Sequence, residues 1–187
     1  MRVLMFVFAV VLMLLLPGCT DLLSVHPLAT AETVVFDVGL TGEWSCADKD
    51  FKGVALIRLG SARDKAYDIV WIPGEADEEP LRLRGQLVKV GDRLVFDLVT
   101  TKKPDMTVPA HFFMLVEQTA DGVKFHWLDS EWLRSQVILQ NTLNHSMLGD
   151  KPVITAGSAE ISAFLLKFGM DPKAVSDTLV FKRAKGQ

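Results

Sequence analysis

From Val34 onward, the hydrophobic residues fall into short segments separated by turn residues. Leu81 and Leu83 alternate with arginines, and Phe125 and Trp127 alternate with polar neighbours in the same way. A period of two is typical of a β-strand that buries one face. The pattern predicts strands near residues 41–46, 54–59, 66–72, 81–89, 94–99, 111–118, 123–128 and 178–183. The connections are short and contain Gly, Pro and Asp, which favours antiparallel hairpins.

One predicted strand, residues 111–116, is apolar on both faces, so a further layer must cover its outer face. Helices can supply that layer. The clearer one is capped by Ser158, has apolar residues at helical spacing and ends at Gly169. A second begins at Asp129 or the next residue and runs toward Asn144. The predicted fold is mainly β: an antiparallel barrel or half-barrel of about eight strands, with two helices inserted before the last strand.

Length and charge narrow the classes of protein. With 187 residues, one domain is expected. The formal net charge of -3 gives none of the basic surplus that nucleic-acid binding requires, so no nucleic-acid partner is predicted. The hydrophobic content of 49% looks high, but 15 of the first 18 residues are hydrophobic. Without them it is about 46%, as in ordinary globular domains.

The N-terminus resembles a secretory signal peptide. Arg2 precedes 14 apolar residues, Val3 to Leu16. This run is shorter than the roughly 20 residues that cross a bilayer as a helix. A positive start, a short apolar run and a small residue at the cleavage point are typical of a secretory signal. We therefore predict that residues 1–18 are removed.

Leu16-Pro17-Gly18-Cys19 resembles the lipobox of bacterial lipoproteins. The resemblance implies that Cys19 is acylated and that its chains (palmitate among them) hold the protein in a membrane. An ordinary secreted protein with a chance cysteine at this position is the alternative. In that family an Asp after the cysteine retains the protein at the inner membrane; Thr20 stands here, which favours the periplasmic face of the outer membrane. Residues 19–33 are expected to form a lipidated tether and residues 34–187 the domain.

The order of seven strands, a helical insert and a returning strand resembles the calycins. Gly42-Glu43-Trp44 is similar to the Gly-x-Trp of lipocalins on the first barrel strand. The resemblance implies that Lys182 or Arg183, on the last strand, packs across Trp44 and closes the barrel. The tract from His111 to Leu133 is also similar to small uncharacterised bacterial lipoproteins, which supply no activity to transfer.

No catalytic or cofactor motif appears in the sequence. The histidines lack metal-ligand spacing, and nucleophile elbows and phosphate loops are missing. The acidic stretch 75–79 lacks the pattern of a calcium loop, and Lys102 and Lys103 are only a weak sign of lipid contact. Cys46, the only cysteine besides Cys19, is expected in a strand. We predict no metal, no cofactor and no enzymatic activity.

The first functional hypothesis is therefore a binding protein for a small apolar ligand. It is supported by large apolar residues at alternating positions, which should face the barrel interior: Ile69, Trp71, Leu83, Phe96, Met114 and Phe125. Any pocket should be dry and should accept an acyl or aromatic group. The alternative is a module that docks on a protein of the cell envelope, supported by the apolar strand 111–116. An interior filled by side chains would exclude a ligand.

Overall fold

A computed structural model of the chain describes residues 23–48, 52–74, 79–101, 110–149, 151–169 and 171–184. The predicted signal peptide, Cys19, most of the acidic stretch and the Lys102-Lys103 pair lie outside these residues. Among the described residues, no helix combines the length and the apolar character that a membrane crossing needs.

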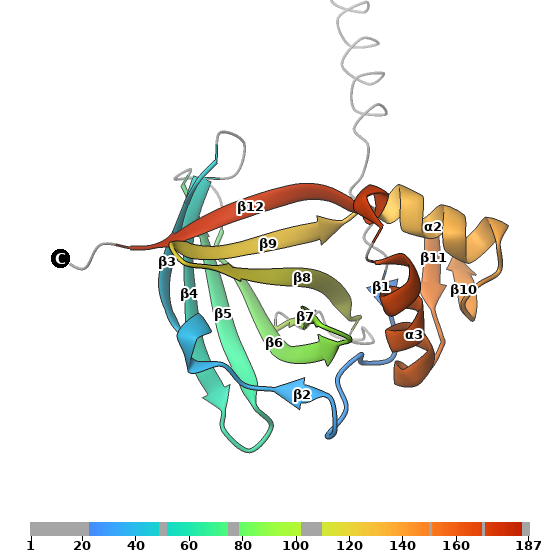
Figure 1. The fold of residues 1–187 in the computed structure, drawn as a ribbon, viewed down its shortest axis with the longest axis horizontal. Helices are drawn as coiled ribbons and strands as arrows, with labels where there is room; N and C mark the ends of the chain where they lie inside the picture. Colours follow the sequence, from blue (N-terminus) through green and yellow to red (C-terminus); the bar gives the residue numbers. More distant parts are fainter. Residues whose placement is uncertain are drawn as a thin grey trace, which may run out of the picture.

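The main sheet is a closed antiparallel barrel of eight strands with one extra strand (Figure 1). The last barrel strand pairs with the first, with Arg183 opposite Trp44. The extra strand, β2 (Val34–Val35), adds to β6 beyond the end of β5. The barrel strands are β3 (Gly42–Ala47), β4 (Lys52–Ser61), β5 (Ala66–Pro73), β6 (Leu81–Val90), β7 (Arg93–Thr100), β8 (Phe112–Thr119), β9 (Gly122–Leu128) and β12 (Val175–Arg183). This confirms the predicted fold class, and closure excludes the half-barrel.

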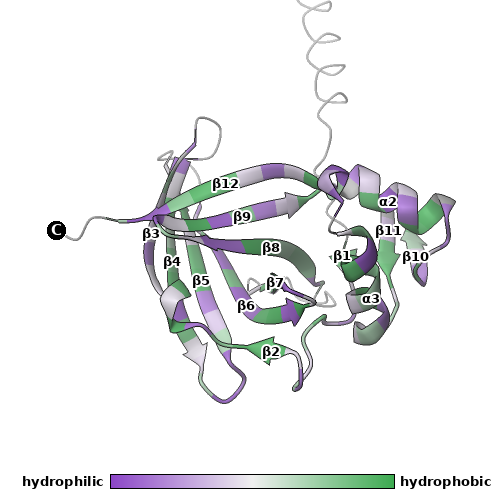
Figure 2. Cartoon of the chain, viewed as in Figure 1, coloured by the Kyte–Doolittle hydropathy of each residue, from purple (hydrophilic) through white to green (hydrophobic). Residues whose placement is uncertain are grey.

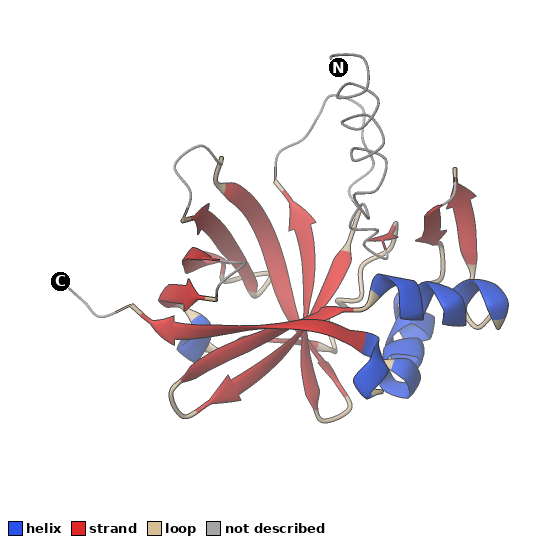
Figure 3. Ribbon diagram, turned by 90° about the horizontal axis from the view of Figure 1, so that it is seen from above, coloured by secondary structure: helices blue, strands red, loops and turns tan. Residues whose placement is uncertain are grey.

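The two α-helices and a small second sheet gather on one side of the barrel (Figure 3). Two α-helices separate β9 from β12, as predicted: α2 (Ser130–Leu139) and α3 (Ser158–Phe168). Between them a hairpin of β10 (His145–Leu148) and β11 (Lys151–Ile154) forms a small sheet with β1 (Leu23–Ser24). Two short 3-10 helices complete the fold, η1 (Val38–Leu40) and η2 (Pro172–Ala174).

Two hydrophobic cores result from this arrangement. The first lies inside the barrel, and the second lies between the outside of β6, β7 and β8 and the two helices. Strand β8 serves both: Val116 is buried in the barrel, while Phe113 and Leu115 are buried in the second core. The helices therefore supply the cover predicted for this doubly apolar strand. Figure 2 shows the alternation of hydrophobic and hydrophilic positions along the barrel strands.

Two local predictions about the helices were wrong. Helix α2 ends at Leu139 rather than near Asn144, because Asn141 adopts a left-handed backbone with φ 46° and the chain turns into the β10–β11 hairpin. Ser158 is not the N-cap of α3. Gly157 holds that position, and its N–H donates to the Glu160 carboxylate at 3.1 Å. The Ser158 hydroxyl instead donates to the carbonyl oxygen of Pro27 at 2.6 Å.

The segment expected to be a tether is folded from Leu23 onward. Leu28 is 1% exposed and belongs to the second core. The buried carboxylate of Asp97 on β7 accepts the backbone N–H groups of Leu28 and Ala29 at 2.8 and 3.0 Å. The domain thus begins well before Val34, and every residue of the two buried cores lies between Leu28 and Phe181.

Candidate functional site

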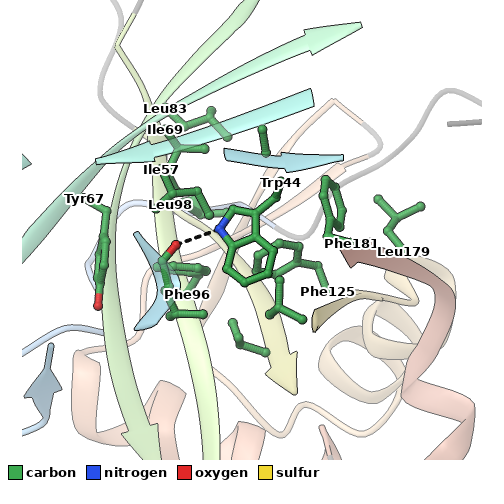
Figure 4. Close-up of a cluster of buried hydrophobic side chains, with 14 of the residues drawn as sticks. Trp44, Ile57, Tyr67, Ile69, Leu83, Phe96, Leu98, Phe125, Leu179 and Phe181 are labelled. Atoms are coloured by element: carbon green, nitrogen blue, oxygen red, sulfur yellow. Dashed lines mark hydrogen bonds between the residues drawn. The ribbon is translucent and has the colours of Figure 1, made fainter. Parts of the chain in front are cut away.

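One end of the barrel is closed by Trp44 and Arg183. The Arg183 guanidinium lies 4.5 Å from the centre of the Trp44 ring. It also donates to the carbonyl oxygens of Gly39 at 2.7 Å and Thr41 at 3.1 Å, on either side of Leu40. The Trp44 indole N–H donates to the Leu40 carbonyl oxygen at 2.9 Å, the bond that is dashed in Figure 4. Arg183 therefore takes the position over the ring, and Lys182 is exposed.

Gly42 is required at this end for two reasons. Its φ is +135°, a conformation that side chains disfavour. A Cβ atom there would also lie 2.6 Å from a guanidinium nitrogen of Arg183. The glycine two residues before the tryptophan therefore makes room for the arginine that covers it.

The opposite end holds an apolar cavity of about 70 Å³. All of the residues proposed for ligand binding line it: Ile69, Trp71, Leu83, Phe96, Met114 and Phe125. Leu81, another lining residue, is 45% exposed and marks where the cavity meets solvent. The parity of the strands thus brings together side chains that are far apart in sequence.

Aromatic rings form the floor and sides of this cavity. Phe125 lies 5.1 Å from Phe181 and 6.0 Å from Phe96, and Trp71 meets Phe181 at 5.6 Å, all between ring centres. Figure 4 shows Phe125 and Phe181 close to Trp44 in the barrel interior. The rings fill most of the barrel and leave only a small void at the open end.

Several lining residues were not identified from the sequence. Leu98 and Trp127 lie two residues beyond the predicted Phe96 and Phe125 on the same strands, so the alternation already pointed to them. Leu179 and Phe181 come from the last strand, whose inward parity can be fixed only by its pairing. The full set adds Ala55, Ile57, Leu81, Leu98, Trp127, Leu179 and Phe181.

No lining residue of this cavity has an ionisable side chain. Tyr67, which is buried in the barrel core, carries a hydroxyl group, and its ring centre lies 5.4 Å from that of Phe96. Burial raises the pKa of the Tyr67 phenol, and its oxygen accepts the Asp37 N–H at 2.7 Å. Cys46 is buried in the same core and carries a free thiol. The cavity can therefore select for shape and apolar character only.

The polar candidates lie elsewhere. His126 on β9 contacts Thr178 and Glu117 on the outside of the barrel, and His26 is exposed. Within the described residues, no group of three or more His, Cys, Asp or Glu side chains could hold a metal ion. His111 differs from these two histidines, because it pairs with the buried carboxylate of Asp97.

Fold and site together define a calycin-like β-barrel with a tryptophan–arginine closure at one end and an apolar cavity at the other. The sequence matches no protein-family model, and no curated protein or solved structure matches the chain.

Proposed function

We propose that this protein is a non-enzymatic, lipid-anchored binding protein of a bacterial cell envelope that holds a small apolar group in the open end of its barrel. The observation that carries the proposal is the cavity of about 70 Å³ whose walls are entirely apolar. An apolar group gains free energy on leaving water for such a surface, whereas a polar group would lose its hydrogen bonds. The lack of an ionisable lining residue favours binding over catalysis.

The size of the cavity limits the ligand. Pockets for drug-sized molecules measure roughly 300–1,000 Å³, well above the volume seen here. The methyl end of an acyl chain or a single aromatic ring suits this space best. The half-buried Trp71, Met114 and Trp127 surround it, so a longer chain would have to displace these side chains.

Native mass spectrometry of the chain from Thr20 onward tests this proposal, because that chain contains both hydrophobic cores and lacks Cys19. Protein purified from bacteria should carry lipid or should take up added fatty acids at roughly micromolar concentration. If it neither retains lipid nor takes up fatty acid, the binding proposal fails, and the module that docks on an envelope partner becomes the account to pursue.

Tryptophan fluorescence locates the binding site. Two of the four tryptophans, Trp71 and Trp127, line the cavity, while Trp132 contacts Phe168 in the second core. Fatty acid should change the emission of the wild type and of Trp132→Phe. The response should be lost when Trp71 and Trp127 are both replaced by Phe. A response that survives that double replacement would place the ligand elsewhere.

The proposed anchor is Cys19, and the supporting observation is the sequence Leu16-Pro17-Gly18-Cys19. The proposed location is the periplasmic face of the outer membrane, because Thr20 rather than Asp follows the cysteine. Docking on an envelope protein was the alternative, and it depended on an exposed apolar face of strand 111–116. Phe113 and Leu115 on that face are buried in the protein's own second core, so the face is not free to dock.

A further inference from the structure

A second, polar cavity of about 540 Å³ lies outside the barrel. Its walls come from the outer face of β6 and β7, the turn between β4 and β5, and the N-terminal segment near Thr30. Its ionisable groups are Arg63, Asp64, Lys65, Arg84, Asp97 and His111. This polar cleft shares no lining residue with the apolar cavity inside the barrel.

Asp97 and His111 form a hydrogen-bonded pair in the wall of the polar cleft. The Asp97 side chain is 2% exposed, and one of its oxygens lies 2.6 Å from Nδ1 of His111. Its other oxygen accepts the backbone N–H groups of Leu28 and Ala29. An ionised carboxylate only accepts hydrogen bonds, so Nδ1 of His111 carries the proton in this contact. The ring is therefore held in one orientation.

The other ring nitrogen of His111, Nε2, has no hydrogen-bond partner among the residues that the structure describes. His111 borders the cleft, and its side chain is 19% exposed. With Nδ1 already protonated, Nε2 can donate only from the doubly protonated, cationic ring. A ligand that accepts a hydrogen bond from Nε2 thus meets a positive charge.

Two further cationic side chains border the cleft without a carboxylate partner in the described part of the chain. Lys65 donates to the Val34 carbonyl oxygen at 3.1 Å, and Arg63 forms no salt bridge with another described residue. The carboxylate of Asp64, between them in sequence, accepts the Ser61 hydroxyl at 3.0 Å. Arg84 is paired with Asp68 at 3.4 Å.

Lys65 has a left-handed backbone conformation, with φ 51°. Gly or Asn is usual in that conformation, and a lysine there is disfavoured. The turn nevertheless places Lys65, and Arg63 two residues before it, at the edge of the cleft. Cationic donors from the turn therefore face the same space as His111.

We propose that this polar cleft binds a small oxyanion, a phosphate or carboxylate group, with His111 Nε2, Lys65 and Arg63 as its donors. Charge-assisted hydrogen bonds to such a group are stronger than those between neutral partners. The anion could belong to a free metabolite or to the headgroup of an anionic lipid, which offer the same oxygen acceptors. This proposal is independent of the apolar cavity.

The test is a titration of the chain from Thr20 onward with inorganic phosphate, followed by nitrogen NMR of the imidazole rings. His111 Nε2 should shift and saturate in the millimolar range, and the signals of His126 should not move. An unchanged His111 signal at saturating phosphate would overturn the proposal.

His111→Asn is the informative variant, because the asparagine amide can still donate to Asp97 while nothing replaces Nε2. Phosphate affinity should fall by about tenfold or more. His126→Asn is the matched control on the outer face and should bind normally. If His111→Asn keeps its fold, judged by circular dichroism, and binds phosphate as well as the wild type, His111 is not a ligand donor and the proposal fails.

Vesicles distinguish the two sources of the anion. Binding to phosphatidylglycerol vesicles but not to phosphatidylcholine vesicles, lost in His111→Asn, would identify a lipid headgroup. Binding of inorganic phosphate without vesicle binding would identify a free anion. Vesicle binding that His111→Asn leaves intact, together with no phosphate shift, would reject the cleft as an anion site.

Discussion

The closure of the barrel by Trp44 and Arg183 makes a quantitative prediction about stability. Trp44 is 4% exposed, and truncating a buried tryptophan to alanine costs about 3–5 kcal/mol. Arg183→Ala removes two hydrogen bonds and the cation–π contact. The arginine is exposed, so these charged contacts are worth less than buried ones. We expect about 1.5–3 kcal/mol for Arg183→Ala.

The interaction between the two residues can be isolated with a double-mutant cycle. The double variant should be less destabilised than the sum of the single variants by about 1 kcal/mol, because the contact is lost only once. Urea unfolding followed by circular dichroism measures each free energy. Each kcal/mol should also lower the melting temperature by roughly 2–4 °C. Lys182→Ala, on the exposed neighbour of Arg183, is the control and should change stability by about 0.5 kcal/mol or less.

Two results would refute this reasoning. Additivity of the two single variants within about 0.5 kcal/mol would mean that the residues do not interact. A Trp44→Ala variant as stable as the wild type would mean that the tryptophan is not part of the core. Arg183→Lys refines the test: it keeps the charge over the ring but cannot hold the Gly39 and Thr41 carbonyl oxygens in a fork, so its stability should lie between those of the wild type and Arg183→Ala.

Three further predictions address the anchor, the core and the cavity. Cys19→Ser should leave an uncleaved precursor on immunoblots and incorporate no labelled palmitate; normal processing would remove the lipoprotein proposal. Tyr67 is the only tyrosine, so the phenolate absorbance reports it alone. Because burial raises the pKa of Tyr67, its phenolate should form at higher pH in the folded protein than in the unfolded chain. The contribution of the neutral Tyr67 to the free energy of unfolding should be complete below about pH 10 and should fall as the pH rises further. A folded protein whose Tyr67 titrates like that of the unfolded chain would contradict this prediction. Ala55→Leu should fill the apolar cavity and abolish fatty-acid binding while the barrel still folds, at a cost of at most about 1–3 kcal/mol if the fit is tight; wild-type binding in a folded variant would show that this cavity is not the site.

The barrel could be predicted from the sequence because its strands alternate. A period of two fixes which residues share a face, so the proposed lining residues Trp71, Leu83 and Met114 do meet in one cavity. The same rule cannot give the width of the void that remains. That depends on how Phe96, Phe125 and Phe181 pack against one another, which is set by three-dimensional contacts between separate strands.

The β10–β11 hairpin was missed for a local reason. Its strands have four residues each, and the predicted helix ran to Asn144, directly before the first of them. The turn signal was present in the sequence: Gly149 has φ 66°, and glycine followed by aspartate often ends a strand. That dipeptide is the sequence signal for the turn between β10 and β11.

The packing of the N-terminal segment on the barrel follows from one buried acid, Asp97. The side chain of Asp97 points outward from β7, on the same face as Val95, and Asp97 lies opposite Phe113 of β8. Val95 and Phe113 are both buried in the second core. An aspartate placed among covered residues must itself be covered, and a buried carboxylate needs hydrogen-bond donors. Neither β7 nor β8 can supply them, since their backbone groups are already paired in the sheet. The two-residue parity of β7 and the apolar outer face of β8 therefore required another segment to bring N–H groups to Asp97. The segment from Leu28 to Ala29 does so, and it leaves the second carboxylate oxygen for His111 at the edge of the polar cleft.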